Sequence, residues 1–146
     1  MKRCYLFVPF LLICALAADP SKQPDAKADL KPLQGVWLIS AVESNGVKVK
    51  PDDAKWVLEG DKYTTKIGTQ VQEGTVKVDP TKDPKWINLS VTAGSNKGQT
   101  YRGIYKVVDD ELLLCFPKNT KADRPTELSG NTENGQTLMV LKRKKE

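Results

Sequence analysis

From Val36 onward, apolar residues recur with a period of two, and Gly, Pro, Asn and Asp interrupt the recurrence at short intervals. Successive side chains of a strand point to opposite faces, so this period gives each segment one buried and one solvated face. The sequence carries no long apolar helix pattern. The period therefore predicts an all-β domain, either a sandwich or a barrel.

The alternation and the turn residues together predict eight principal strands. Asn45-Gly46 favours positive φ at both central positions of a hairpin turn, 47–49 is expected to pair back briefly, and 52–54 is expected to open a helical turn. The eight strands are expected at residues 36–43, 55–59, 62–67, 72–79, 86–92, 100–108, 111–116 and 136–143.

Most of the predicted connections are short, which favours an antiparallel meander in which sequence neighbours pair. The longest irregular stretch is 117–135. Closing the meander into an eight-stranded antiparallel up-and-down β-barrel removes the exposed sheet edges. The fold predicted is this barrel, and a partly open barrel remains the alternative.

The N-terminus has the anatomy of a secretory signal peptide. Lys2 and Arg3 form a positive segment, 5–13 is apolar, and 15–17 reads Ala-Leu-Ala, a small-x-small cleavage site. Residues 1–17 are therefore predicted to be a signal peptide. The exported protein is expected to be periplasmic or extracellular.

Two alternatives to cleavage at Ala17 stay open. An uncleaved anchor is disfavoured because the apolar run is shorter than the roughly 20 residues of a membrane span and contains Pro9. Lipidation at Cys14 is disfavoured because the residue before it, Ile13, is bulky where a lipobox carries a small residue.

Residues 18–32 are expected to be a flexible linker, and 33–146 the folded domain. The linker contains Pro, Ser, Lys, Ala, Asp and Gln and lacks aromatic residues. Such a composition buries too little apolar area to offset the entropy of ordering. The domain is expected to be monomeric.

The charge pattern argues against nucleic acid as a partner. The formal net charge is +5, but the lysines alternate with Asp and Glu, and only 142–145 forms a basic run. Binding of single-stranded nucleic acid needs aromatic residues interleaved with the charge, and this run has none. We expect no nucleic-acid partner and no stable membrane insertion.

The chain contains no histidine. This removes the usual general base, the Ser-His and Cys-His nucleophile pairs and the commonest zinc ligand. Cys115 lies in an apolar run and is expected to be a buried, inert thiol. Asp79 and Asp83 flank a proline-rich turn and are interpreted as turn formers, with calcium ligation as the alternative. The sequence predicts no catalytic residue, cofactor or metal.

Four aromatic side chains are expected on the inner face of the barrel: Tyr63, Tyr101, Tyr105 and Phe116. An eight-stranded barrel is just wide enough to be filled by side chains or to hold one small ligand. These residues are therefore either core or ligand-lining. Gly103, between two of them, either leaves room for a ligand or accommodates a bend.

The opening Gly35-Val36-Trp37, the strand count and the basic end of the last strand resemble the lipocalin and calycin pattern. In that pattern a Gly-x-Trp closes the barrel base and a basic residue from the last strand packs on the indole. The matching positions are Gly35, Trp37 and Arg143, with Lys142 or Lys144 as alternatives by a register slip. A guanidinium over an indole face gains cation–π energy.

A wider set of motifs is similar to a small secreted lipocalin-like domain family of planctomycete-type bacteria. The motifs are Leu-Gln-Gly-Val-Trp, 79–85, Gly-Ile-Tyr at 103–105, Arg-Pro-Thr-Glu at 124–127 and the closing Leu-Lys-Arg. This resemblance covers about 33–143. It implies the fold and export, and it implies no activity.

The function predicted first is non-catalytic binding of a small apolar or amphipathic ligand inside the barrel. The alternative is an interaction module with a packed barrel, which would contact an envelope protein through 117–135 or through an exposed patch near Trp56 or Trp86. A hydrolase that uses two converging carboxylates is the third hypothesis.

Overall fold

The structure is a computed structural model that describes residues 26–146. The predicted signal peptide, Cys14 and the first part of the predicted linker, 18–25, lie outside the described residues.

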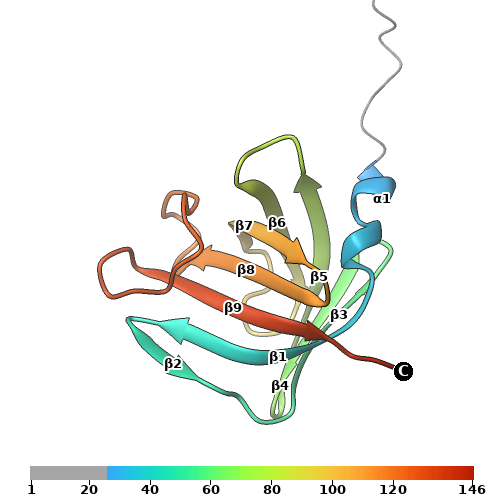
Figure 1. Cartoon of the computed structure of the whole chain (residues 1–146), viewed down its shortest axis with the longest axis horizontal. Coiled ribbons are helices and arrows are strands. Elements are labelled where there is room, and N and C mark those ends of the chain that lie inside the picture. The colour runs from blue at the N-terminus through green and yellow to red at the C-terminus, as the bar shows by residue number, and fades with distance from the viewer. Residues whose placement is uncertain (1–25) are drawn as a thin grey trace, which may run out of the picture.

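A single antiparallel sheet closes on itself to form the domain (Figure 1). Its strands follow the chain order except that β2 lies outside β1, and β1 pairs with β9 to close the barrel. Eight strands thus form the barrel and β2 is an addition, which confirms the predicted eight-stranded fold. The strands are β1 Gly35–Ser44, β2 Val47–Val49, β3 Ala54–Glu59, β4 Lys62–Ile67, β5 Gln70–Asp79, β6 Lys85–Ala93, β7 Thr100–Val108, β8 Glu111–Pro117 and β9 Gln136–Arg143.

The residues of two turns explain the backbone conformation there. Asn45 and Gly46 have φ values of 54° and 72°, so the predicted hairpin turn between β1 and β2 is confirmed. The helical turn expected at 52–54 is wrong. Asp53 has a φ of 45° and reverses the chain directly into β3, which begins at Ala54.

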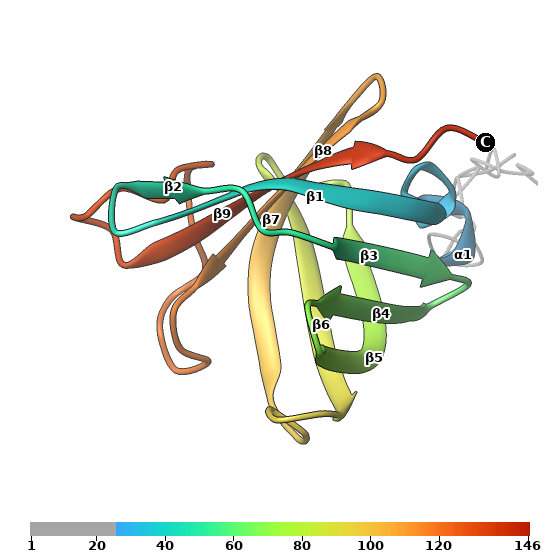
Figure 2. The same ribbon diagram turned by 90° about the horizontal axis from the view of Figure 1, so that it is seen from below.

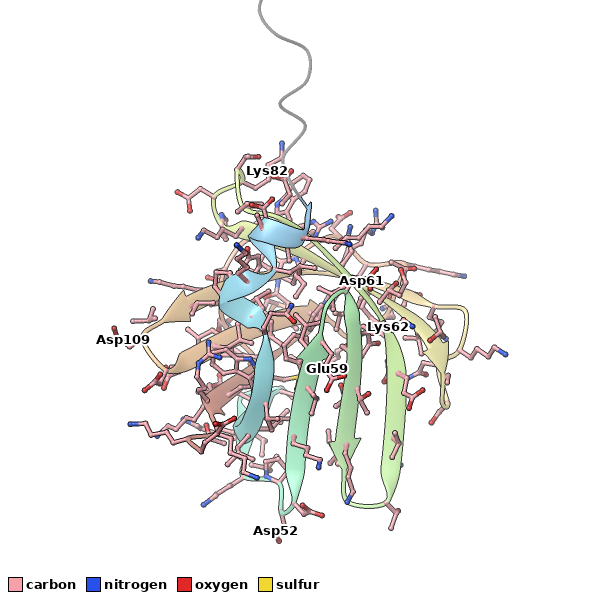
Figure 3. The ribbon with its side chains drawn as sticks, turned by 90° about the vertical axis from the view of Figure 1, so that its right-hand side faces the viewer. Asp52, Glu59, Asp61, Lys62, Lys82 and Asp109 are labelled. Atoms are coloured by element: carbon pink, nitrogen blue, oxygen red, sulfur yellow. The ribbon has the colours of Figure 1, made fainter. Side chains whose placement is uncertain are left out.

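The two ends of the barrel differ. At one end, here called the plug end, lie the N-terminal segment, the turns Gly60–Asp61 and Asp109–Asp110, and the C-terminus (Figure 1). At the other end, called the mouth, lie the turn after β4 and the long β8–β9 connection. Figure 3 shows Asp61 near the N-terminal helix and Asp52 at the opposite end of the strands.

The N-terminal segment forms part of the domain. α1 (Ala26–Asp29) and η1 (Lys31–Leu33) precede β1, and Leu30 and Leu33 are 3% and 0% exposed. The predicted linker therefore extends too far. Residues 26–32 pack on the plug end because the apolar side chain of Leu30 is buried there. The overall composition of the segment is polar and does not show the effect of this single residue. Neither helix of the described chain has the length and apolar character needed to cross a membrane.

The plug-end half of the interior is packed. Five apolar side chains from five different strands are buried there together: Leu58, Val76, Ile87, Leu112 and Leu141. They occupy the inward positions predicted by the period of two. Leu30 and Leu33 belong to the same buried cluster and cover this group at the plug end, so the core is continuous with the N-terminal segment.

A second, smaller buried layer lies outside the barrel, beneath the β8–β9 connection. Ile104 and Cys115 are paired across β7 and β8, and both are 0% exposed. Ile104 shares its face of β7 with Arg102 and Lys106, and it is buried there because the connection 118–135 covers this part of the sheet. The Cys115 thiol donates to the Ser129 carbonyl at 3.5 Å.

Arg124 ties this cover to the sheet. Its guanidinium donates to the carbonyl oxygens of Gly103 at 2.6 Å and Ile87 at 3.2 Å, and to Asn88 Oδ1 at 2.9 Å. It also lies 4.4 Å from the ring centroid of Trp86. Partial burial and the neighbouring Arg102 lower the pKa of Arg124. Proline 125, the next residue, is buried.

Candidate functional site: an apolar cavity at the barrel mouth

The plug end is sealed by the residues that the sequence singled out. The Arg143 guanidinium carbon lies 4.1 Å from the centroid of the Trp37 ring. Arg143 donates to the carbonyls of Gln34 and Pro32, each at 2.8 Å, and the Trp37 indole N–H donates to the Leu33 carbonyl at 2.9 Å. Gly35 has a φ of 107°, a backbone conformation that residues with a side chain rarely adopt, and lies beside the guanidinium. Trp37 is fully buried beneath this lid.

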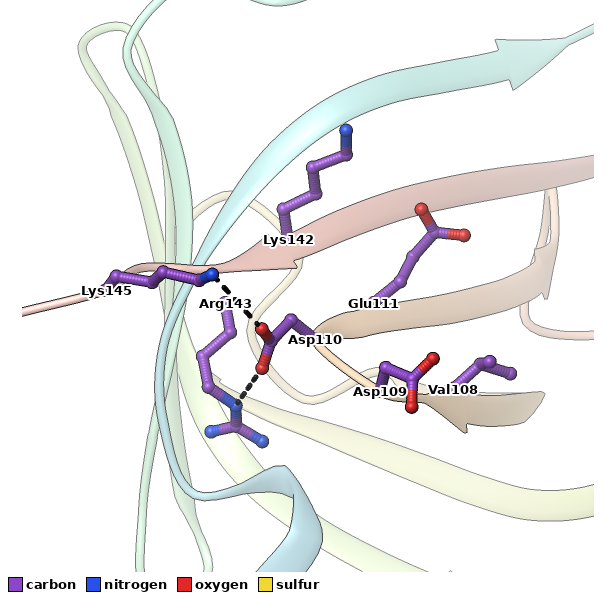
Figure 4. Close-up of a pocket in the computed structure, with 7 residues that line it drawn as sticks. All are labelled: Val108, Asp109, Asp110, Glu111, Lys142, Arg143 and Lys145. Atoms are coloured by element: carbon purple, nitrogen blue, oxygen red, sulfur yellow. Dashed lines mark ion pairs between the residues drawn. The ribbon is translucent and has the colours of Figure 1, made fainter.

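A charged hollow lies on the surface beside the plug (Figure 4). It collects Asp109, Asp110 and Glu111 from one side and Lys142, Arg143 and Lys145 from the other. Three of its charged side chains form ion pairs with one another. Asp110 pairs with Arg143 at 4.0 Å and with Lys145 at 3.7 Å. Exposed pairs of this kind contribute little, and we interpret the hollow as part of the closure.

The mouth half of the interior contains a cavity of about 260 Å³. Leu89, Leu114 and Met139 lie at mid-strand positions on three walls, and Trp56 lies on a fourth. The cavity is mostly apolar and opens toward the mouth. Its lining residues are Trp56, Tyr63, Thr65, Ile67, Gln72, Leu89, Tyr101, Leu114, Phe116, Pro117, Lys118, Thr137 and Met139.

The strand pairing explains why the interior is hollow here. β1 pairs with β3 only from Gly35 to Leu38, and from Val42 to Ser44 it pairs with β2 instead. On its other side β1 pairs with β9 from Trp37 to Ser44, across a bulge between Ile39 and Ala41. The wall between β1 and β3 therefore separates toward the mouth. Figure 2 shows β1, β2 and β9 extending away from β3 at this end.

Two glycines shape the cavity walls. A Cβ at Gly103 would lie 2.4 Å from Cδ1 of Phe116, and one at Gly74 would lie 2.7 Å from Cε1 of Tyr63. The room left by Gly103 is therefore occupied by the Phe116 ring. Each glycine therefore lets an aromatic ring that lines the cavity approach the backbone closely.

Several polar groups line the cavity among the apolar ones. Gln72 Nε2 donates to the Tyr63 hydroxyl at 3.1 Å, and the Tyr101 hydroxyl donates to Gln99 Oε1 at 3.1 Å. Burial raises the pKa of Tyr63, so its hydroxyl stays protonated. Lys118, at the mouth, donates to Asn45 Oδ1.

The indole Nε1 of Trp56 has no hydrogen-bond partner within residues 26–146. Among these described residues it is the one buried side-chain nitrogen or oxygen atom of which this is true. The residue is 1% exposed, and its ring stacks with that of Tyr63 at a centroid distance of 6.3 Å. An exposed patch near Trp56 was expected if the domain were a packed interaction module. That expectation is wrong, because Trp56 points into the barrel.

The structure brings three of the four predicted aromatic residues to this cavity. Tyr63, Tyr101 and Phe116 line it. Tyr105 does not. It is 5% exposed, belongs to the core, and pairs with Lys85 at the start of β6, near the plug end. Burial and the charges of Asp29 and Asp79 raise its pKa.

Sequence reasoning missed Trp56, Gln72 and Met139 as lining residues. The period of two does indicate an inward position for Trp56, since Trp56 alternates with Val57 and shares its face with the buried Leu58. Gln72 and Met139 stand in no motif, and only the three-dimensional closure of the barrel brings them together.

Among residues 26–146, none of those lining the cavity is acidic. Nor do three or more His, Cys, Asp or Glu side chains converge in this part of the chain to form a metal-binding group. Burial raises the pKa of the Cys115 thiol, which lies outside the barrel under its cover.

The fold and the cavity define a closed, lipocalin-like β-barrel with one sealed end and one open end. Comparison with known protein families, with curated proteins and with solved structures finds no match. The cavity and its lining are therefore the basis for a functional proposal.

Proposed function

We propose that this protein is an exported, non-catalytic binding protein that holds a small apolar or amphipathic molecule in the mouth half of its barrel. The cavity of about 260 Å³ between Trp56, Tyr63, Tyr101 and Phe116 is the observation that carries the proposal. Aromatic walls with a few polar groups are typical of small-molecule sites.

The size of the cavity limits the ligand. A protein cavity of about 150 Å³ is enough for benzene, so this cavity of about 260 Å³, which opens at the mouth, suits a molecule of about ten non-hydrogen atoms. A long-chain fatty acid would protrude through the mouth. The expected ligand is therefore a compact, mono- or bicyclic molecule.

Thermal unfolding of the full chain with graded probes tests the proposal. Benzene, naphthalene and palmitate are the probes, and naphthalene is expected to stabilise most. At ten times its Kd a ligand adds about 1.4 kcal/mol, which raises the Tm of a domain this size by about 5 °C. Absence of any stabilisation by all three would overturn the proposal.

Variants at Met139 supply the matched control. Met139 is half-buried and lines the cavity. Met139→Trp is expected to fill the space and abolish the naphthalene effect, whereas Met139→Leu keeps the volume and should retain it. Equal binding by both variants would show that the probe binds elsewhere.

A second candidate function is docking of a protein partner at the mouth. Four exposed apolar side chains lie on the strands and turns of this end, which favours a contact surface. They are Val47, Val49, Ile67 and Val71. Cross-linking from a Val49→Cys variant in the native envelope tests this alternative, with Val108→Cys at the plug end as the control.

A further inference from the structure

One of the residues that line the proposed ligand site carries a hydrogen-bond donor without an acceptor in the described part of the chain. Trp56 lines the cavity, is almost fully buried, and its indole N–H has no acceptor within residues 26–146. Buried N–H groups are nearly always paired, because an unpaired one costs about 1–3 kcal/mol. The indole of Trp37 illustrates the rule, since it donates to the Leu33 carbonyl.

Neighbouring polar atoms do not satisfy this donor. Thr65 pairs with Trp56 across β3 and β4, and Tyr63 stacks with its ring, yet neither provides an acceptor to Nε1. The Tyr63 hydroxyl accepts a hydrogen bond from Gln72. Its own hydrogen is then a second donor at the same cavity.

We infer that the ligand of this cavity carries an uncharged hydrogen-bond acceptor, a carbonyl, ether or ring nitrogen, which pairs with the Trp56 indole N–H. This inference rests on the proposed binding function and specifies its ligand class. An unpaired buried donor makes a site selective, because a ligand without an acceptor leaves that donor unsatisfied.

The charges around the cavity exclude the ionic alternatives. A cationic ligand would meet no carboxylate among the described lining residues. A carboxylate placed at Trp56 would be buried away from Lys118, the one charged lining residue, which is exposed at the mouth. Burying an ion without a partner costs far more than burying a neutral acceptor.

Matched bicyclic probes test the inference. Naphthalene, quinoline and isoquinoline have the same shape and ten non-hydrogen atoms, but only the last two carry an acceptor. We expect the better of the two to bind the full chain about tenfold more tightly than naphthalene, the gain of about one buried hydrogen bond. 1-Naphthoate is expected to bind more weakly than either.

The indole ¹⁵N–H resonances report the contact directly. The chain has three tryptophans, and Trp37 and Trp86 serve as internal references. The Trp56 resonance is expected to move downfield with the acceptor probes and not with naphthalene. In Trp56→Phe both probe types should bind, with the preference for the acceptor lost. The wild-type spectra decide the question if this variant does not fold.

The outcomes separate the two proposals. If none of the probes binds, the binding function itself fails. If all bind equally, and the Trp56 N–H resonance responds to none of the acceptors, the binding function stands and the acceptor inference is overturned. Tighter binding of 1-naphthoate than of quinoline would overturn the requirement for an uncharged acceptor.

Discussion

Arg143, the last residue of β9, lies over the indole of Trp37 in β1, with its guanidinium carbon 4.1 Å from the ring centroid. The same guanidinium donates to two carbonyls of the segment that leads into β1. One side chain therefore joins the last strand, the first strand and the N-terminal segment. This fixes the plug end and leaves the mouth as the entry to the interior.

Replacing Arg143 tests how much this lid contributes to stability. Arg143→Met removes two charge-assisted hydrogen bonds and the cation–π contact, and is expected to lower the free energy of unfolding by about 2 kcal/mol. Arg143→Lys keeps the charge but loses the planar fork, so it should recover only part of the loss. Urea denaturation measures both.

Lys145→Met is the control for charge. Lys145 pairs with the same Asp110, but its side chain is 83% exposed, so its loss should change stability little. A loss equal to that of Arg143→Met would show that net charge, rather than the lid geometry, stabilises this end.

The sequence predicts the barrel strands well because each is amphipathic with a period of two. The pairing of Trp37 with Arg143 is implied by the resemblance to the lipocalin pattern, which leaves Lys142 and Lys144 as alternatives, and the register of β1 and β9 selects Arg143. The burial of Cys115 is predicted from the apolar run around it, but the burial of Ile104 does not follow from its strand position. It depends on the connection 118–135, which has no periodicity and packs through single contacts such as those of Arg124.

The cavity is predictable only in part. Tyr63, Tyr101 and Phe116 follow from the alternation, which places them inward. The open space follows from β1 leaving β3 after Leu38, a long-range exchange of partners that local patterns do not encode. Trp56 follows from the alternation too, but a sequence does not show that its N–H has no partner.

Gly130 anchors the cover to the barrel at the end of β1. A Cβ at this position would lie 2.1 Å from the Glu43 carbonyl oxygen, and the Gly130 carbonyl accepts a hydrogen bond from Gly46 at 2.9 Å. Gly130→Ala should therefore displace the cover and lower the free energy of unfolding by about 2–3 kcal/mol. Chemical denaturation measures this loss.

Gly68→Ala is the comparison for Gly130→Ala. Gly68 has a φ of 57° and open space around its Cβ direction, so only backbone strain opposes a side chain there. That strain costs about 1 kcal/mol. If Gly68→Ala were the more damaging of the two, the contact between Gly130 and Glu43 would not be what holds the cover.

Arg124 should control access to Cys115. Removing its three hydrogen bonds in Arg124→Gln loosens the cover above the thiol, and local opening exposes it to reagents. With Cys4 and Cys14 replaced by serine, native-state labelling of Cys115 is expected to accelerate at least about tenfold. Arg102→Gln, at an exposed position of β7, should leave the rate unchanged. Equal acceleration in both variants would contradict the role of Arg124.

Alkaline pH should destabilise the fold through its buried tyrosines. Burial raises the pKa of Tyr63 and of Tyr105 above the ordinary value of 10.0, so in the folded protein both hydroxyls keep their protons where the unfolded chain loses them. The unfolded state then binds fewer protons, and the free energy of unfolding falls as pH rises above about 10. Below that pH both tyrosines are protonated in the folded and in the unfolded protein, and their full contribution to the free energy of unfolding is present.

The variant Tyr63→Phe/Tyr105→Phe isolates this effect from the other groups that titrate at high pH, such as lysines, which both proteins share. Denaturation between pH 8 and 11.5 is expected to show a shallower loss of stability in the double variant than in the wild type. The difference between the two curves should be constant below about pH 9 and change only above it. Parallel curves across the whole range would mean that folding does not raise the pKa of either tyrosine, and that the interior near them is open to water.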